Sequence, residues 1–121
     1  ERMNINNDII NSLTVELKRG TLVLLVLSQL GTAEYGYSLV QKLEENNTPI
    51  EAGTLYPLLR RLEKQKLLKS QWDTTESRPR KFYTISDEGK IIYKELKKEW
   101  RTISKALEDM IKEDDGDEIN W

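Results

Sequence analysis

The sequence predicts a mostly α-helical fold with one small β-hairpin. Three observations support this fold class: a stretch rich in Leu and Val over residues 13–30, an apolar stripe at helical spacing over residues 55–62, and a heptad pattern over residues 93–110. Between the last two lie short runs with aromatic residues, as in strands. The chain has 121 residues, the size of one domain, and 37% of them are hydrophobic.

Two helices are expected in the first third of the chain. Residues 1–12 are polar and Asn-rich, which fits a frayed N-terminal arm or the lead-in to a helix. Residues 13–30 lead to Gly31, a residue typical of the position after a helix. Leu22–Leu27 alone also fits a buried strand, but the length of the stretch favours a single helix. A short amphipathic helix follows from Gly36 to Asn46.

The third helix has the clearest pattern in this half. Thr54 is a suitable N-cap, and it places Pro57 in the first turn, where a missing backbone N–H is tolerated. The apolar residues recur at i, i+3, i+4 and i+7 and share one face, formed by Leu55, Leu58, Leu59 and Leu62. The opposite face carries a tyrosine and three cations, namely Tyr56, Arg60, Arg61 and Lys64.

A hairpin is expected after the third helix. Leu68–Asp73 and Arg80–Ile85 predict two strands, joined by a polar loop of about six residues. Trp72 and Phe82 are assigned to the hairpin core. An isolated hairpin is marginal in water, so this one must pack on the helices.

A long helix is expected from its cap at Ser86 to Lys112, followed by an acidic tail over residues 113–121. Its apolar residues alternate between spacings of three and four, as in the seam of a coiled coil. Such a stripe needs a second surface to cover it, and a like helix from a second copy is the simplest one. The predicted dimer interface is Tyr93, Leu96, Trp100, Ile103, Leu107 and Met110.

This order of elements is that of a winged helix-turn-helix domain. In that arrangement the third helix enters the major groove and the hairpin, or wing, touches the adjacent backbone. We therefore expect a DNA-binding domain over residues 13–85 and a dimerisation helix over residues 86–112.

The charge distribution agrees with a nucleic-acid partner. The net charge is −2, but residues 1–112 hold all 19 basic residues and 16 acidic ones, a net of +3. Residues 52–81 hold eight basic and three acidic residues, a net of +5. The sequence has no Cys and no His, and no Gly-rich phosphate loop, so we expect no enzyme, no metal site and no cofactor. No apolar run approaches the roughly 20 residues of a membrane span, and no secretory signal is evident, so we expect a cytoplasmic protein.

Four segments resemble the PadR-like transcriptional regulators, in the order of that family. They read ELKRGTL over residues 16–22, YGYSL over 35–39, GTLYPLLRRLE over 53–63 and RKFYTISDEG over 80–89. The resemblance covers roughly residues 14–112, and the single C-terminal helix is similar to that of the short subfamily. Lys66 stands where the family's third helix commonly ends with Gly, so we expect that cap to be made differently. Ser77–Pro79 stands where the wing usually carries Gly.

The resemblance implies a homodimer that represses transcription from an inverted-repeat operator and is released by a small ligand. Phosphate contacts are expected from cations and from the start of the second helix: Lys18, Arg19, Lys64, Arg78, Arg80, Lys81, Tyr37 and Ser38. Base readout is expected from the third helix, by Thr54, Tyr56 and Arg60, with Gly53 and Pro57 allowing close approach of the backbone. Arg61 is a further expected DNA contact.

Some of these residues have ordinary alternatives. Arg60 and Arg61 also fit solubilising charges, and Arg80 with Lys81 also fits the charges that protect an edge strand from aggregation. Tyr56 favours DNA, because an aromatic ring on the polar face of a helix buries nothing without a partner.

Trp100 has two interpretations. It is a packing residue at the centre of the seam, or it forms a slot for a flat aromatic ligand, as the resemblance implies for some short PadR-like proteins. Tyr93, Leu17 and Val15 are the other expected slot residues.

Two functions therefore compete. The first is a homodimeric DNA-binding regulator, a repressor whose partners are double-stranded operator DNA and a small aromatic or hydrophobic ligand. The second is a protein–protein interaction module on a winged-helix scaffold that does not bind DNA.

Overall fold

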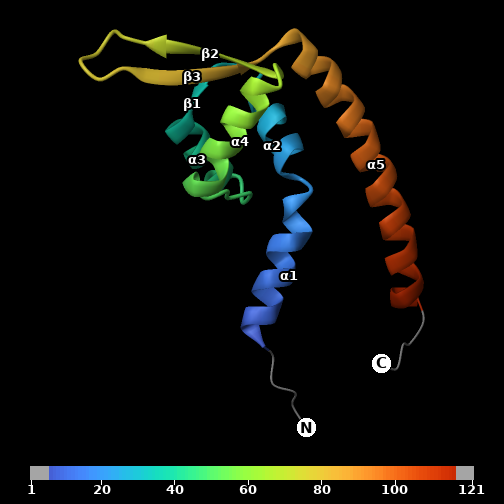
Figure 1. Ribbon diagram of the computed structural model, residues 1–121. Helices are drawn as coiled ribbons and strands as arrows, with labels where there is room; N and C mark the ends of the chain where they lie inside the picture. Colours follow the sequence, from blue (N-terminus) through green and yellow to red (C-terminus); the bar gives the residue numbers. More distant parts are fainter. Residues whose placement is uncertain (1–5, 117–121) are drawn as a thin grey trace.

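The computed structural model describes residues 6–116, in a mostly helical fold with a small antiparallel sheet (Figure 1). The fold class predicted from the sequence is confirmed. The element order is α1 (Asn7–Arg19), α2 (Leu22–Gln29), β1 (Glu34–Tyr35), α3 (Gly36–Glu45), α4 (Ala52–Lys64), β2 (Leu68–Asp73), β3 (Arg80–Ile85) and α5 (Asp87–Gly116).

The core lies between α2, α3, α4 and the sheet. The four leucines of the predicted α4 face are all buried, and the same cluster takes in Leu27 and Leu30 from α2 and its C-cap. Leu39 and Leu43 from α3 and Leu68 and Ile85 from the sheet complete it. This packing fixes α4 against the body by one face and leaves its other face free.

The prediction of a single helix over residues 13–30 is wrong, because the helix is interrupted at Gly20 and Thr21. Both the backbone N–H and the hydroxyl of Thr21 donate to the carbonyl of Lys18, at 2.9 and 2.7 Å, and so terminate α1. Residues 7–12 are helical, so of the two alternatives for this segment the frayed arm is wrong for these residues. Helix α1 begins at Asn7, capped by the side chain of Asn6, and none of its residues is buried.

The sheet has three strands in the order β1-β3-β2, one more than predicted. The hairpin strands have the predicted bounds, and Leu68 pairs with Ile85 at one end and Asp73 with Arg80 at the other. The added strand β1 is only two residues long, and it pairs Tyr35 with Phe82. It attaches the start of α3 to the wing, by which we mean β2, β3 and the loop of residues 74–79.

Helix α4 begins at Ala52 rather than after Thr54. The N–H groups of Thr54 and Leu55 both bond to the carbonyl of Glu51, which makes Glu51 the N-cap and corrects the predicted Thr54 cap. Thr54 therefore belongs to the first turn, and Pro57 lies inside the helix.

The end of α4 corrects the expectation for Lys66. Lys66 adopts a φ of 67°, its N–H bonds to the carbonyl of Glu63, and the N–H of Leu67 bonds to that of Leu62. This is the Schellman pattern that usually contains Gly, so the cap is made in the usual way by a lysine.

Helix α5 is capped as predicted, by the hydroxyl of Ser86, which accepts the N–H of Gly89 at 2.9 Å. The helix continues to Gly116, beyond the predicted end at Lys112, so the start of the expected acidic tail is helical and residues 117–121 lie outside the described part. Its first turns pack on α2, and in Figure 1 its second half and α1 extend beyond the body. No helix within residues 6–116 is long and apolar enough to cross a membrane.

Candidate nucleic-acid interface

The face of α4 opposite the core is exposed and basic. Gly53, Pro57, Arg60 and Lys64 follow one another at spacings of four, three and four residues, so they share this face. Within the described residues, neither Arg60 nor Lys64 has a hydrogen-bond or ion-pair partner. These two cations are therefore free to meet an external anion.

Arg61 and Thr54 lie beside this face rather than on it. Arg61 lines a hollow between α2, α4 and α5, together with Leu96 and Trp100. Thr54 precedes Arg61 by seven residues, so it lies on the same side of α4, where it lines a hollow next to the end of α1. The structure thus separates Arg61 from Arg60, although the two are adjacent in sequence.

Tyr56 corrects an argument made from the sequence. Its ring is partly buried against the hydrophobic core, and it lies over Gly36 at the start of α3. The premise that this ring buries nothing without a partner is wrong. Tyr56 packs the two helices together, and its contact with DNA stays a prediction.

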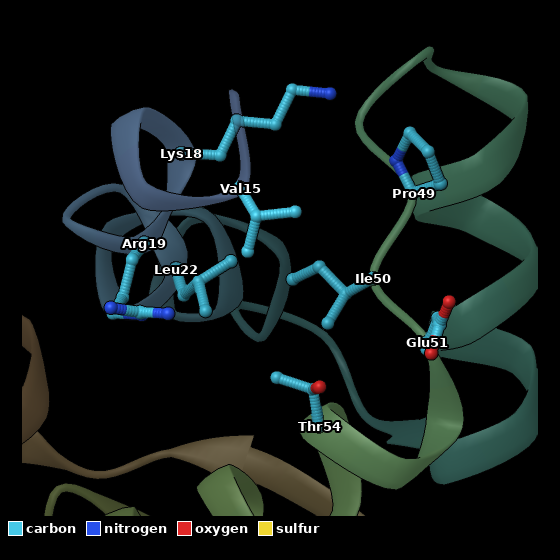
Figure 2. Close-up of a pocket in the computed structure, with 8 residues that line it drawn as sticks. All are labelled: Val15, Lys18, Arg19, Leu22, Pro49, Ile50, Glu51 and Thr54. Carbon is cyan, nitrogen blue, oxygen red and sulfur yellow. The ribbon is translucent and has the colours of Figure 1, made fainter. Parts of the chain in front are cut away.

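Lys18 and Arg19 lie at the rim of a hollow of about 350 Å³ between α1 and the start of α4 (Figure 2). Figure 2 shows Val15 and Leu22 turned toward Ile50, with Thr54 on the α4 side. The two cations therefore stand beside the N-terminus of α4, which carries positive partial charge. The carboxylate of Glu51, the N-cap of α4, lines the same hollow and offsets part of this positive charge, so a phosphate contact by Lys18 and Arg19 stays a prediction.

The start of α3 offers one of its two predicted donors. The hydroxyl oxygen of Ser38 lies 2.9 Å from both Glu34 Oε1 and the carbonyl oxygen of Tyr35, which share its one proton, so the hydroxyl is occupied within the fold. Tyr37 is 47% exposed, stacks on Tyr35 with ring centroids 5.7 Å apart, and accepts a hydrogen bond from Arg80. Its own hydroxyl proton remains available.

Arg80 is embedded in a cluster that joins the wing to α3. Its guanidinium lies 4.6 Å from the centroid of the Tyr35 ring, donates to Tyr37 Oη at 2.9 Å, and pairs with Glu76 at 3.3 Å. The hydroxyl of Tyr35 donates to Asp73 at 2.5 Å. That bond, with further bonds from Thr75, lowers the pKa of Asp73 to about 2, and the same bond raises the pKa of Tyr35.

Lys81 is likewise held inside the protein. Its Nζ lies 2.9 Å from Glu63 Oε1 of α4, and the hydroxyl of Ser70 donates to the other oxygen of the same carboxylate. The bond from Ser70 and the bond from Lys81 lower the pKa of Glu63, and the pKa of Lys81 is raised by Glu63. In the loop of the wing, Arg78 is exposed and has no hydrogen-bond or ion-pair partner within residues 6–116.

The assignment of Trp72 to the hairpin core is wrong, because 63% of its surface is exposed. Phe82 is half-buried and meets Tyr35 edge to face, with centroids 5.9 Å apart. The difference has a simple cause: Phe82 lies on the central strand, beside β1, whereas Trp72 lies near the free end of β2.

The predicted dimer seam divides into two parts. Tyr93 and Leu96 pack against the core of their own chain. The other four are exposed along the second half of α5, namely Trp100, Ile103, Leu107 and Met110. Helix α1 also exposes apolar side chains, among them Ile9, Leu13 and Leu17.

Trp100 and Tyr93 line a hollow of about 380 Å³ between α2 and α5, with Lys97 and Arg101. Within one chain the other two predicted ligand residues lie elsewhere: Val15 lines the hollow of Figure 2, and Leu17 is exposed on α1.

Tyr35, Glu63 and Asp73 organise the wing, and the sequence did not single them out. Tyr35 and Asp73 are 38 positions apart, and Glu63 meets Ser70 and Lys81 at 7 and 18 positions, so no helical or strand period marks these pairs. Within residues 6–116, no group of three or more carboxylates could hold a metal ion.

Residues 23–95 match the model of the PadR-like family of transcriptional regulators. A PadR family regulator from Eggerthella lenta is 48% identical and has a TM-score of 0.82, with 87% of this chain and 94% of that chain covered. A PadR family regulator from Clostridium difficile is 30% identical, with a TM-score of 0.68 over 75% of this chain and 98% of that one.

Bacillus subtilis PadR in complex with operator DNA has the same fold at 20% identity. Its TM-score is 0.59, over 63% of this chain and 45% of that one. The family model covers most of the described chain, and the resemblance read from the four sequence segments is confirmed. The chain belongs to the PadR-like family of transcriptional regulators.

Proposed function

We propose that the protein is a homodimeric DNA-binding repressor that recognises an inverted-repeat operator. The observation that carries this proposal is the exposed face of α4, where Arg60 and Lys64 have no partner in the described chain. Cations that are not paired internally can neutralise phosphates or reach base edges, and each phosphate contact releases counterions. A DNA-binding regulator works where the DNA is, so we also propose a cytoplasmic location.

Two further groups of cations extend the proposed contact. Lys18 and Arg19 stand beside the start of α4, and Arg78 stands on the loop of the wing. Their positions flank the α4 face, as backbone contacts flank the recognition helix in winged helix-turn-helix proteins.

The proposed dimer contact is the second half of α5. Trp100, Ile103, Leu107 and Met110 are between 47% and 65% exposed and follow one stripe. An apolar stripe of this length on a projecting helix calls for a covering surface, and a two-fold related copy supplies one. A dimer would also hold two α4 faces at a fixed distance, as an inverted repeat requires.

The proposed effector site is the hollow lined by Trp100 and Tyr93. Its walls are mostly apolar, and Lys97 and Arg101 are the cations in its lining. A flat aromatic molecule fits this composition, and its binding beside the α5 seam would alter the distance between the two α4 faces.

The test is duplex binding by the purified protein to DNA that carries an inverted repeat, measured at two salt concentrations. We expect affinity to fall steeply with salt and a footprint over two half-sites about one helical turn (~10 bp) apart. Arg60→Ala should weaken binding severalfold, whereas the matched control Lys105→Ala, on the exposed side of α5, should not. Salt-independent binding, or equal losses in both variants, would contradict the proposal and favour a protein–protein module.

A further inference from the structure

Trp72 is the large apolar side chain of the wing that the fold leaves bare. It lies near the end of β2 and is 63% exposed. Its partner across the ladder is Lys81, whose Nζ lies 6.0 Å from the centroid of the indole ring. Exposing the large apolar ring of a tryptophan to water is unfavourable. Surface tryptophans are enriched at binding interfaces, where a partner covers the ring.

The strand register places Trp72 on the side of the wing that faces α4. Side chains alternate along a strand, so Trp72 shares a face with Ser70 and Leu68. Leu68 is part of the core, and Ser70 and Lys81 both bond to Glu63 of α4. Trp72 therefore continues the surface of α4 outward along the wing, which extends past α4 in Figure 1.

The contacts to Glu63 hold this surface in place. Two bonds from two strands converge on one carboxylate of α4, so the position of the wing is tied to that of the recognition helix. Lys81 is thereby a positioning residue: it is held by Glu63, and its ammonium lies beside the indole of Trp72.

The positive charge around Trp72 indicates which class of partner this surface binds. Residues 52–81 carry a net charge of +5, and Arg78 and Lys64 near the wing and α4 end have no described partner. A polyanion is attracted to this surface, and the apolar area that duplex DNA offers beside its phosphates is the face of each deoxyribose. Apolar side chains of DNA-binding proteins meet the duplex there and in the minor groove.

We propose that Trp72 packs its indole on the sugar–phosphate backbone of bound duplex DNA, next to the groove that α4 enters. This inference rests on the proposed DNA-binding function and adds an uncharged contact that the cation pattern does not include. The inference predicts that Trp72 contributes to duplex affinity without releasing counterions, so its contribution does not depend on salt.

The first test compares Trp72→Ala with Gln71→Ala, its exposed neighbour on the other face of β2, in duplex binding at several salt concentrations. Trp72→Ala should weaken binding about tenfold. The slope of log affinity against log salt should stay unchanged, whereas Arg78→Ala should make it shallower by about one. Gln71→Ala should match the wild type.

The second test uses a Trp100→Phe, Trp121→Phe chain, in which Trp72 is the remaining tryptophan. Because Trp100 belongs to the proposed dimer seam, the self-association and duplex affinity of this chain are first matched to those of the wild type. Saturating duplex should reduce quenching of this tryptophan by acrylamide severalfold, because the ring is covered. Unchanged quenching in the bound state would overturn the inference.

The outcomes separate the two proposals. If the wild type binds duplex and Trp72→Ala binds equally well, the inference fails and the DNA-binding function stands. If the wild type binds no duplex, both fail. If Trp72→Ala weakens self-association in sedimentation, the indole is a contact between copies and the inference is overturned.

Discussion

Gly36 at the start of α3 lies directly under the ring of Tyr56 in α4. A Cβ added at Gly36 would lie 2.8 Å from Cζ and 2.9 Å from Oη of Tyr56, closer than such atoms approach. The angle between the two helices of the DNA-binding motif is therefore set by a glycine and an aromatic ring that fit one another.

Gly36→Ala should destabilise the fold by about 1–3 kcal/mol, because the added methyl group overlaps the ring. The measurement is chemical denaturation at constant protein concentration. In a Tyr56→Ala background the same change should cost much less, since the overlapping ring is gone. Equal costs in the two backgrounds would show that the contact does not couple the helices.

Gly53→Ala separates folding from binding. A Cβ at Gly53 meets no atom within 4 Å, and Ala is a better helix former than Gly, so stability should stay equal or rise by up to about 1 kcal/mol. Duplex affinity should fall, because the methyl group stands on the face that we propose meets the DNA. Unchanged affinity would mean that the helix backbone does not come close to the duplex at this point.

Asp73→Asn should lower stability in a pH-dependent way. The pKa of Asp73 is about 2 in the folded protein and near 3.8 when unperturbed, so the ionised carboxylate stabilises the fold above pH 4. That contribution is lost as pH falls from 4 toward 2, where the wild type and the variant should converge. Urea denaturation across this range measures the difference.

Tyr35→Phe provides the control, because it removes the main donor to Asp73. The pKa of Asp73 should then rise toward its usual value, which an NMR titration of the carboxyl carbon reports. A pKa that stays near 2 would assign the effect to Thr75 and to the charge of Arg80 instead.

Leu107→Asp tests the proposed dimer. Leu107 is 50% exposed within one chain, so an aspartate there leaves the monomer's core intact but places charges in the seam. Sedimentation should show dissociation, and the footprint should shrink to weak occupancy of single half-sites. Glu95→Ala, at an exposed position of α5 outside the seam, is the control and should remain dimeric.

Trp100→Ala tests the proposed effector site. Removing the indole should abolish the quenching of tryptophan fluorescence by flat aromatic compounds, or loosen the dimer, since the ring lies at both the hollow and the seam. Thr102→Ala, which is exposed and outside both, serves as the control. A variant with an unchanged dimer and an unchanged ligand response would show that Trp100 has neither role.

The sequence predicted the elements that are marked by local patterns. The leucines of α4, the bounds of the two hairpin strands and the Ser86 cap all follow from spacing within a few residues. Strand β1 has two residues, too few for a period, and it exists only because β3 lies beside it. The interruption between α1 and α2 at Gly20 and Thr21 could not be predicted from composition, because apolar residues occur on both sides of it.

The candidate site was predictable by residue type but not by pairing. Arg60 and Lys64 have no partner in the described chain, as their position on the exposed face of α4 predicts. Arg80 and Lys81 are equally basic in the sequence, but in the structure other side chains bind them. Their partners Tyr37 and Glu63 lie 43 and 18 positions away. Only the fold shows which cations are occupied.

In the proposed dimer, the exposed apolar side chains of α1 and of the second half of α5 would link folding to assembly. With Leu13 and Ile103 both about 60% exposed in one chain, much of the hydrophobic gain comes only when a partner covers them. Thermal melting should therefore shift upward as the protein becomes more concentrated. Dilution alone would then lower the fraction of regulator that is folded. The amount of protein that a cell makes would therefore affect the stability of each copy.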